Sequence, residues 1–325
     1  MKLVTGTKAE HELLSVGKRL LSERRKVQEE QQKQVESFMK LRKRAAREFK
    51  RELFDQALRT AGIAVQALTD RQSQDQESIA KFIETQRQEA VARSGQNNEL
   101  QRAAMSERLK RWNQVLKPQS DMAGFPVSVY LESATEIVQT GEGTTSIAPQ
   151  QNLVHTKAEV SSGGYLGGPF EGDLVFIDWH FLWTPPRDGL LNATSFLQMN
   201  GASWLAINSD CNGGSASSSI NASITLTQLN ADGQPHSDSE NTTLLDQLIQ
   251  NSGWDSVGEV QFINLNESDT VGNGRAFQFP VLGDIPILVT VSATLYVLGR
   301  NAQASLDFLS GEFQLNVPFV FLMLN

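Results

Sequence analysis

Asp178 and His180 are the pair of side chains in this sequence best suited to acid–base chemistry. They lie two residues apart in the apolar segment 174–183, which we expect to form a strand. Residues two apart in a strand share a face, so a carboxylate would stand beside an imidazole, the minimum for proton transfer. His180 could act with Asp188 or Asp210 if loops brought them together.

A glycan hydrolase would need two carboxylates about 5 to 9.5 Å apart, and the candidates are Asp173, Asp178, Asp188 and Asp210. The sequence contains no Gly-x-Ser-x-Gly elbow, P-loop, dinucleotide fingerprint or His-Glu-x-x-His motif. We therefore predict that the Asp178 and His180 pair faces solvent opposite a packed aromatic face, and that the protein is not an enzyme.

Metal-binding patterns are incomplete. The single cysteine, Cys211, excludes an internal disulfide and a multi-cysteine zinc site. The segment 208–214 matches the first half of a calcium loop, but Ser219 occupies the twelfth position, where a bidentate Glu is needed. We predict no metal site and no cofactor.

Four tryptophans of the C-terminal part, Trp179, Trp183, Trp204 and Trp254, could form a surface on which sugar rings stack. The alternative is that they are core residues, because fold and aromatic content alone do not establish a binding site.

A basic patch lies in the N-terminal part and comprises Arg42, Lys43, Arg44, Arg47, Lys50 and Arg51. Such a helical patch could follow a nucleic-acid backbone or an anionic membrane. Acidic residues interrupt it, however, and no aromatic stacking platform accompanies it. We rank those partners below an acidic protein surface, in this chain or in a neighbouring one.

The 325-residue chain divides by charge. Residues 1–120 hold 25 basic and 16 acidic side chains, a net charge of +9, whereas residues 121–325 hold 4 and 21, a net charge of −17. Twenty of the 24 glycines and nine of the ten prolines follow residue 120. The sequence therefore predicts an α+β protein in two segregated parts: long helices over 1–120 and an antiparallel β-sandwich or jelly roll over 121–325.

Apolar residues in the first part form narrow stripes. Val16, Val27, Phe38 and Phe49 recur every eleven residues, a spacing of 3.67 per turn that favours straight helices. Such stripes should pair with other helices, in a folded-back bundle or in a coiled-coil stalk shared by several chains. We expect helix breaks at Gly62, at 70–75 and at 94–98.

The second part alternates apolar and polar residues, most clearly over 220–227 and 289–297, as half-buried strands do. About ten short strands are expected, with one helix over 241–252. The apolar segment 318–324 is predicted to be a central strand or an edge sealed against another subunit.

These features favour a non-enzymatic structural or attachment protein, of the virion-fibre or capsid-associated type. In this interpretation the N-terminal helices, and also the C-terminal strand, assemble several copies, and a sandwich head binds a glycan, a cell surface or a neighbouring subunit. The alternative is a soluble toxin with membrane-active helices. No signal-peptide core or membrane span is present in the sequence, so we expect synthesis in the cytoplasm, with the virion or the extracellular space reached after release.

Overall fold

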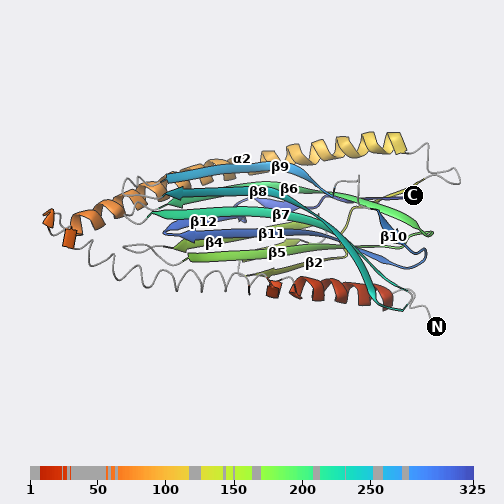
Figure 1. Ribbon diagram of the computed structural model, residues 1–325. Coiled ribbons are helices and arrows are strands. Elements are labelled where there is room, and N and C mark those ends of the chain that lie inside the picture. Colours follow the sequence, from red (N-terminus) through yellow and green to blue (C-terminus); the bar gives the residue numbers. More distant parts are fainter. Residues whose placement is uncertain are drawn as a thin grey trace.

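Two antiparallel sheets packed face to face form the body of the protein (Figure 1). The structure is a computed structural model and describes residues 8–23, 25–27, 30, 56–57, 60–62, 65–116, 126–141, 144–148, 151–162, 170–207, 213–230, 232–251, 259–272 and 278–325.

Sheet A is built around β6 (Gly189–Ile207), which pairs antiparallel with five other strands. The remaining described strands of sheet A are β1 (Val127–Leu131), β3 (Thr144–Ala148), β4 (Leu153–Ser162), β9 (Glu259–Val271), β10 (Phe279–Val281), β12 (Ala302–Phe308), β13 (Gln314–Asn316) and β14 (Val320–Leu324). Sheet B has the order β2 (Glu136–Gly141), β5 (Phe170–Trp183), β11 (Ile287–Arg300), β7 (Gly214–Leu229) and β8 (Pro235–Asn251).

The core lies between the sheets and follows the predicted alternation, because side chains in a strand point to its two faces in turn. Along β11 every second residue points inward and is fully buried: Val289, Val291, Ala293, Leu295 and Val297. The neighbouring β7 continues the same layer with Ile220, Ala222, Ile224 and Leu226. The alternation predicted over 220–227 and 289–297 is therefore confirmed.

The predicted segregation into a helical part and a sandwich part is wrong. The protein is mostly β, and its main described helical segments, residues 8–23 with 25–27 and α2 (Val65–Leu116), pack lengthwise on opposite faces of the sandwich (Figure 1). No long N-terminal helical bundle or stalk occurs in the described ranges. The narrow stripes pack on sheets instead of on helices because the outer faces of both sheets carry apolar residues of their own. The sequence boundary at residue 120 stays a prediction.

The N-terminal helix covers sheet B. Leu13 is fully buried against Leu229 and Leu288, and Lys18 Nζ lies 2.6 Å from a carboxylate oxygen of Glu136. Val27, expected on the buried stripe, is 54% exposed. Of the other members of that stripe, positions 38 and 49 lie outside the described residues.

α2 covers sheet A along a stripe that repeats every eleven residues. The centre of the stripe follows positions 79, 83, 87, 90, 94, 98, 101, 105 and 109, all buried or half-buried, in steps of four, four and three. This spacing gives 3.67 residues per turn, so the stripe stays nearly parallel to the helix axis. Neighbouring positions such as 84, 86, 91, 95 and 97 are half-buried and widen it. The 52-residue helix is about 78 Å long, and the 19 residues of β6 span about 63 Å, so the helix is longer than the strand that it covers.

Two of the predicted helix breaks are wrong. α2 runs without interruption through 70–75 and 94–98, since the polar residues of the second segment bond to the sheet rather than end the helix. The break at Gly62 is confirmed: its φ is +68°, a left-handed conformation that glycine adopts readily, and the Ala61 amide donates to Ala57 O.

The helix predicted over 241–252 is also wrong, because residues 241–251 belong to β8. A register shift opposite Ile220 and Asn221 inserts Leu244 as an extra residue. The bulge displaces the alternation by one, and the resulting spacing of Leu244, Leu245, Leu248 and Ile249 imitates a helix.

The C-terminal segment is a central strand, as one of the two alternatives predicted. β14 lies between β1 and β6, with Leu322 in the sandwich core and Phe321 packed toward α2. Both of its edges are therefore paired within the chain.

Gly201 provides a test of packing in sheet A. A Cβ at this position would lie 2.5 Å from both Asp307 O and Phe308 Cδ1, so Gly201→Ala forces backbone or a buried ring to move. We expect a loss of about 1 to 3 kcal/mol in the free energy of unfolding, measured by denaturant titration. Gly95→Ala is the control: its Cβ would meet only the end of the Glu312 side chain, and alanine favours the helix. Equal effects of both variants would contradict this account.

Candidate functional site

Asp178 and His180 share a face of β5, as predicted, but that face is not solvent-exposed. Both are buried, and His180 Nδ1 lies 3.0 Å from Thr290 Oγ1. A Cβ on Gly17 would lie 3.1 Å from His180 Cε1, so the N-terminal helix covers the imidazole. The imidazole therefore lies inside a helix–sheet interface, and neither side chain of the pair is at a surface open to substrate.

The other candidate acids hold backbone amides in separate places. Asp173 accepts a hydrogen bond from the Glu159 amide at 3.0 Å, and Asp188 accepts one from the Gly283 amide at 2.7 Å. Asp210 and most of the calcium-like segment, 208–212, lie outside the described residues. Within the described part of the chain, no group of three or more His, Cys, Asp or Glu side chains could hold a metal ion.

The tryptophans do not form the predicted stacking surface as a set. Trp179 is fully buried in the core and donates its indole N–H to Asn152 O. Trp204 is buried beneath α2, stacked on Phe262 with ring centroids 6.3 Å apart. Trp183 is half-buried against the core, and Trp254 lies outside the described residues.

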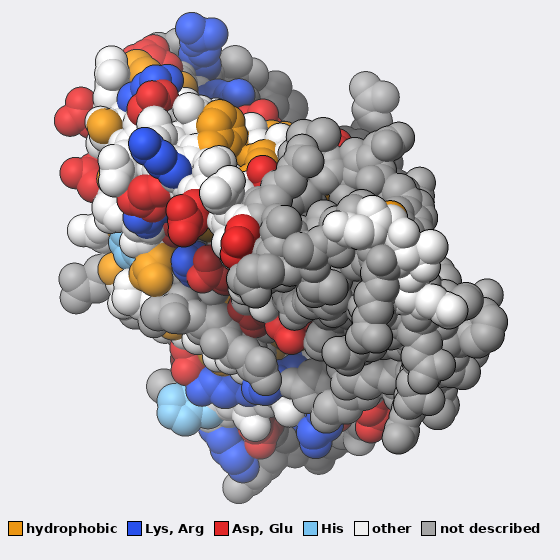
Figure 2. Space-filling view, turned by 90° about the vertical axis from the view of Figure 1, so that its left-hand side faces the viewer, with side chains coloured by type: hydrophobic (Ala, Val, Ile, Leu, Met, Phe, Trp, Pro, Cys, Tyr) orange, Lys and Arg blue, Asp and Glu red, His pale blue; other side chains and the backbone are white. Residues whose placement is uncertain are grey.

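The basic patch of Arg42, Lys43, Arg44, Arg47, Lys50 and Arg51 also lies outside the described residues. Viewed from one end, the described surface carries basic and acidic side chains interspersed, without a large area of one sign (Figure 2).

The outward-facing side chains of β8 form an exposed row that is polar at every position except Leu248. β8 pairs only with β7 and forms an edge of sheet B. All of its outward-facing residues are exposed; we call this row the β8 strip, and it consists of Ser237, Ser239, Asn241, Thr243, Asp246, Leu248 and Gln250. Asn221 of β7 extends the strip sideways and accepts a hydrogen bond from Thr243 at 2.8 Å.

The strands around the strip carry no positive charge. β7, β8 and β9 contain no lysine or arginine, whereas β8 and β9 together contain six carboxylates. Asp238 and Glu240 stand on the side of β8 that faces the opposite sheet, where charges discourage pairing with a further strand. The edge therefore suits side-chain recognition better than strand addition.

A second concentration of polar groups lies under α2. We call it the amide cluster: Asn98, Gln101, Gln198, Asn200 and Asn316. Asn200 Nδ2 donates to Asn98 Oδ1 at 2.7 Å, and Asn98 Nδ2 donates to Glu312 O at 2.8 Å. Gln101 Nε2 donates to Met199 O at 2.9 Å, and Asn316 Nδ2 donates to Gln198 Oε1 at 3.1 Å.

Buried amides contribute less to stability than apolar packing, but they accept only one alignment of the two elements. The cluster lies between two apolar contacts, one around Ile83 and Trp204 and the other around Met105 and Phe319. It fixes where the repeating stripe of α2 sits on the sheet. In the sequence, the helix side of this cluster corresponds to the run 94–98, whose composition alone predicts a helix stop.

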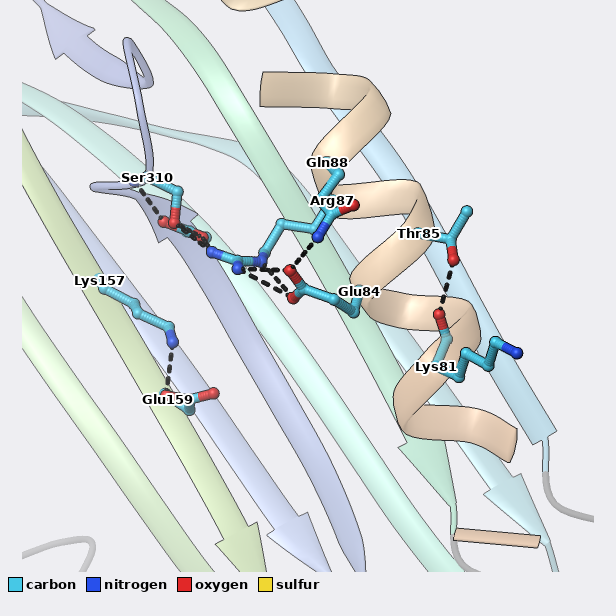
Figure 3. A network of polar contacts seen from close by, with 9 residues as sticks. Lys81, Glu84, Thr85, Arg87, Gln88, Lys157, Glu159 and Ser310 are labelled. Atoms are coloured by element: carbon cyan, nitrogen blue, oxygen red, sulfur yellow. Dashed lines mark hydrogen bonds and ion pairs between the residues drawn. The ribbon is translucent and has the colours of Figure 1, made fainter. Parts of the chain in front are cut away.

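Arg87 fastens the N-terminal half of α2 to the turn after β12 (Figure 3). Its guanidinium donates to Ser310 Oγ at 2.8 Å and to both carboxylate oxygens of Glu84 at 2.9 Å. Ser310 Oγ in turn donates to the buried Asp307 at 2.6 Å. Hydrogen bonds from Gln88 and then Arg87 lower the pKa of Glu84 below its usual value.

No helix in the described part of the chain is long and apolar enough to cross a membrane.

Comparisons with known proteins give weak likenesses only. No protein-family model and no curated protein matches the chain. A family 61 carbohydrate-binding module in complex with β-1,4-galactotriose aligns with a TM-score of 0.20 and 11% identity, covering 58% of this chain and 90% of the module.

Two further solved structures align at similar levels. A β-(1,4)-mannanase of Podospora anserina with a carbohydrate-binding module has a TM-score of 0.18 and 12% identity over 62% of this chain and 28% of its own. A lectin from Bauhinia forficata in complex with GalNAc has a TM-score of 0.17 and 7% identity over 56% and 99%. The weak neighbours thus include carbohydrate-binding modules, but at these TM-scores they carry no argument about this chain.

The pH dependence of stability tests the Glu84 contact. Because the folded-state pKa of Glu84 is lowered, its contribution is present above the ordinary pKa and is lost as the pH falls through the lowered value. We expect Glu84→Gln to lower the Tm at neutral pH and to have a diminishing effect as the solution is acidified below about pH 4. Thermal melts of both proteins across that range measure the difference.

Glu89→Gln is the matched control, since the exposed pair of Glu89 with Arg93 should contribute little at any pH. A Glu84→Gln effect that stayed constant with pH would contradict a role for the ionised carboxylate.

Proposed function

We propose that the protein is a non-enzymatic attachment protein whose β-sandwich contacts a glycan-bearing surface through the β8 strip. One observation carries the proposal: α2 packs on the outer face of sheet A and the N-terminal helix packs on part of the outer face of sheet B, around Leu229 and Leu288, while the β8 strip on that same face stays exposed along a 17-residue edge strand.

The chemistry of the strip favours a neutral ligand rich in hydroxyl groups. Ser, Thr, Asn and Gln side chains both donate and accept hydrogen bonds, and Asp246 adds one strong acceptor. Sugar hydroxyls have the same dual character. The outward row runs the length of the strand, at every second residue on either side of the bulge, which suits an extended chain of sugars better than a compact small molecule.

Electrostatics argues against polyanionic partners at this surface. Six carboxylates and no lysine or arginine on β8 and β9 would repel nucleic acid, anionic lipid and sulfated glycans. The same charges favour a second candidate partner, a basic surface on a neighbouring subunit.

Absence of catalysis is part of the proposal. It is supported by the separate structural contacts of Asp173, Asp188 and His180, which do not converge on one exposed site. The virion-fibre arrangement is not retained, because it required a helical stalk that the described residues do not form.

Binding to immobilised polysaccharides tests the proposal. We expect the full chain to bind at least one neutral polysaccharide and not heparin in affinity electrophoresis. The double variant Asn241→Ala, Thr243→Ala should weaken binding about tenfold or more, since it removes two ligand hydrogen bonds. Gln96→Ala, an exposed amide on α2, is the control and should bind normally.

The salt dependence of binding distinguishes a glycan ligand from a basic partner subunit. Glycan binding through neutral hydrogen bonds should persist from about 0.05 M to about 0.5 M salt, whereas attraction to a basic subunit should be screened. If no neutral polysaccharide binds, or if the double variant binds as well as the parent, the glycan proposal is wrong.

A further inference from the structure

α2 and the sheet beneath it form apolar clusters separate from the sandwich core. Ile79, Ile83 and Ala90 pack with residues such as Trp204, and Met105 packs with Phe196. None of these residues belongs to the cluster between the two sheets. The sandwich therefore keeps its core packing if α2 leaves.

Removal of α2 would uncover an aromatic face. The aromatic residues that pack in its two contacts are Tyr130, Phe196, Trp204, Phe262, Phe313, Phe319 and Phe321. Apolar surfaces of this kind are normally covered in a soluble protein. Whatever covers it must also satisfy the amides at its centre.

α2 carries the complement of that face in the required order. Ile83, Asn98 and Met105 follow one another along its stripe, opposite the aromatic, amide and aromatic parts of the sheet. The N-terminal helix has no amide at the corresponding places of its buried stripe, which consists of Ala9, Leu13, Gly17 and Leu21. The fitting occupant is therefore an α2 helix.

We propose that α2 exchanges between two copies of the chain, so that the helix of each protomer docks on sheet A of its partner. The exchange is reciprocal and gives a two-fold symmetric dimer with the same contacts as the closed monomer. Ten residues join Leu116 to Val127, and an extended linker of this length reaches at most about 35 Å, which sets how far apart the two sandwiches can stand. This inference goes beyond the attachment role and does not depend on it.

The chain concentration determines whether the closed monomer or the exchanged dimer is populated. In the monomer, the tether holds α2 near its own sheet at an effective concentration in the millimolar range. The closed monomer should prevail at micromolar concentration, and the exchanged dimer should appear near millimolar concentration or after unfolding and refolding of mixed chains.

Disulfide trapping tests the exchange. A Cβ on Gly311 lies 3.6 Å from Val91 Cβ, within the range that a disulfide spans. In a Cys211→Ser background, Val91→Cys chains are mixed at about millimolar concentration with Gly311→Cys chains of different tag length. After co-refolding and oxidation, we expect a cross-chain disulfide at least ten times more abundant than for the control pair Phe82→Cys with Gly311→Cys, because Phe82 is exposed.

The double variant Val91→Cys, Gly311→Cys shows whether the site closes within one chain despite the left-handed φ of +60° at Gly311. Closure in the double variant without any cross-chain product in the mixture would overturn the proposal.

A peptide competition does not depend on cysteine variants. A fluorescent peptide of residues 73–111 is titrated with the full native chain, and its anisotropy is followed. Saturable binding, weakened by Asn98→Leu in the peptide, is expected if the docked helix can be replaced. No binding at millimolar chain concentration would overturn the exchange, and neither result bears on polysaccharide binding.

Discussion

β6 is buried on both of its faces, and this constraint organises the rest of the molecule. Every residue from Ser195 to Ile207 is buried, although one face of the strand points away from the sandwich core. A strand in a two-layer sandwich normally leaves its outer face to water. Here the outer positions include Trp204 and Ala206, which are apolar. α2 runs along this face of the strand and shields both residues from water.

The cover determines where recognition can occur. With α2 on sheet A and the N-terminal helix on sheet B, the polar pair Asp178 and His180 becomes interior. Exposed polar side chains remain along the edge strand β8, beyond the described helical contacts. Residues whose types suggested catalysis, such as His180, are therefore buried and serve in packing. Residues without an obvious chemical role, such as Asn241, remain at the surface.

Sequence periodicity was sufficient to predict which strand residues face the core, but not which surface each helix packs on. The alternation from Val289 to Val297 identified the inward positions correctly, because apolar residues occupy the core side of the strand and mostly polar residues the other side. It did not show that Thr290 and Ser292, on that other side, are buried as well. Narrow apolar stripes in the first 120 residues indicated that faces of the helices are buried, but the polar middle of the α2 stripe, 94–98, predicted a helix break instead. A stripe also does not identify the surface that it packs on. The sequence alone did not show that α2 packs on sheet A, since Asn98 and Asn200 are 102 positions apart and come into contact only in the folded protein.

The eleven-residue period of α2 has a consequence for how its length can change. An insertion or deletion of eleven residues before Ile79 spans about three turns, so it rotates the preceding chain by only about 20° and moves it by about 16 Å along the axis. Lengths far from a whole number of turns rotate the preceding chain about the axis. The helix is therefore modular toward its N-terminus, whereas its middle, held by the amides, admits no such change.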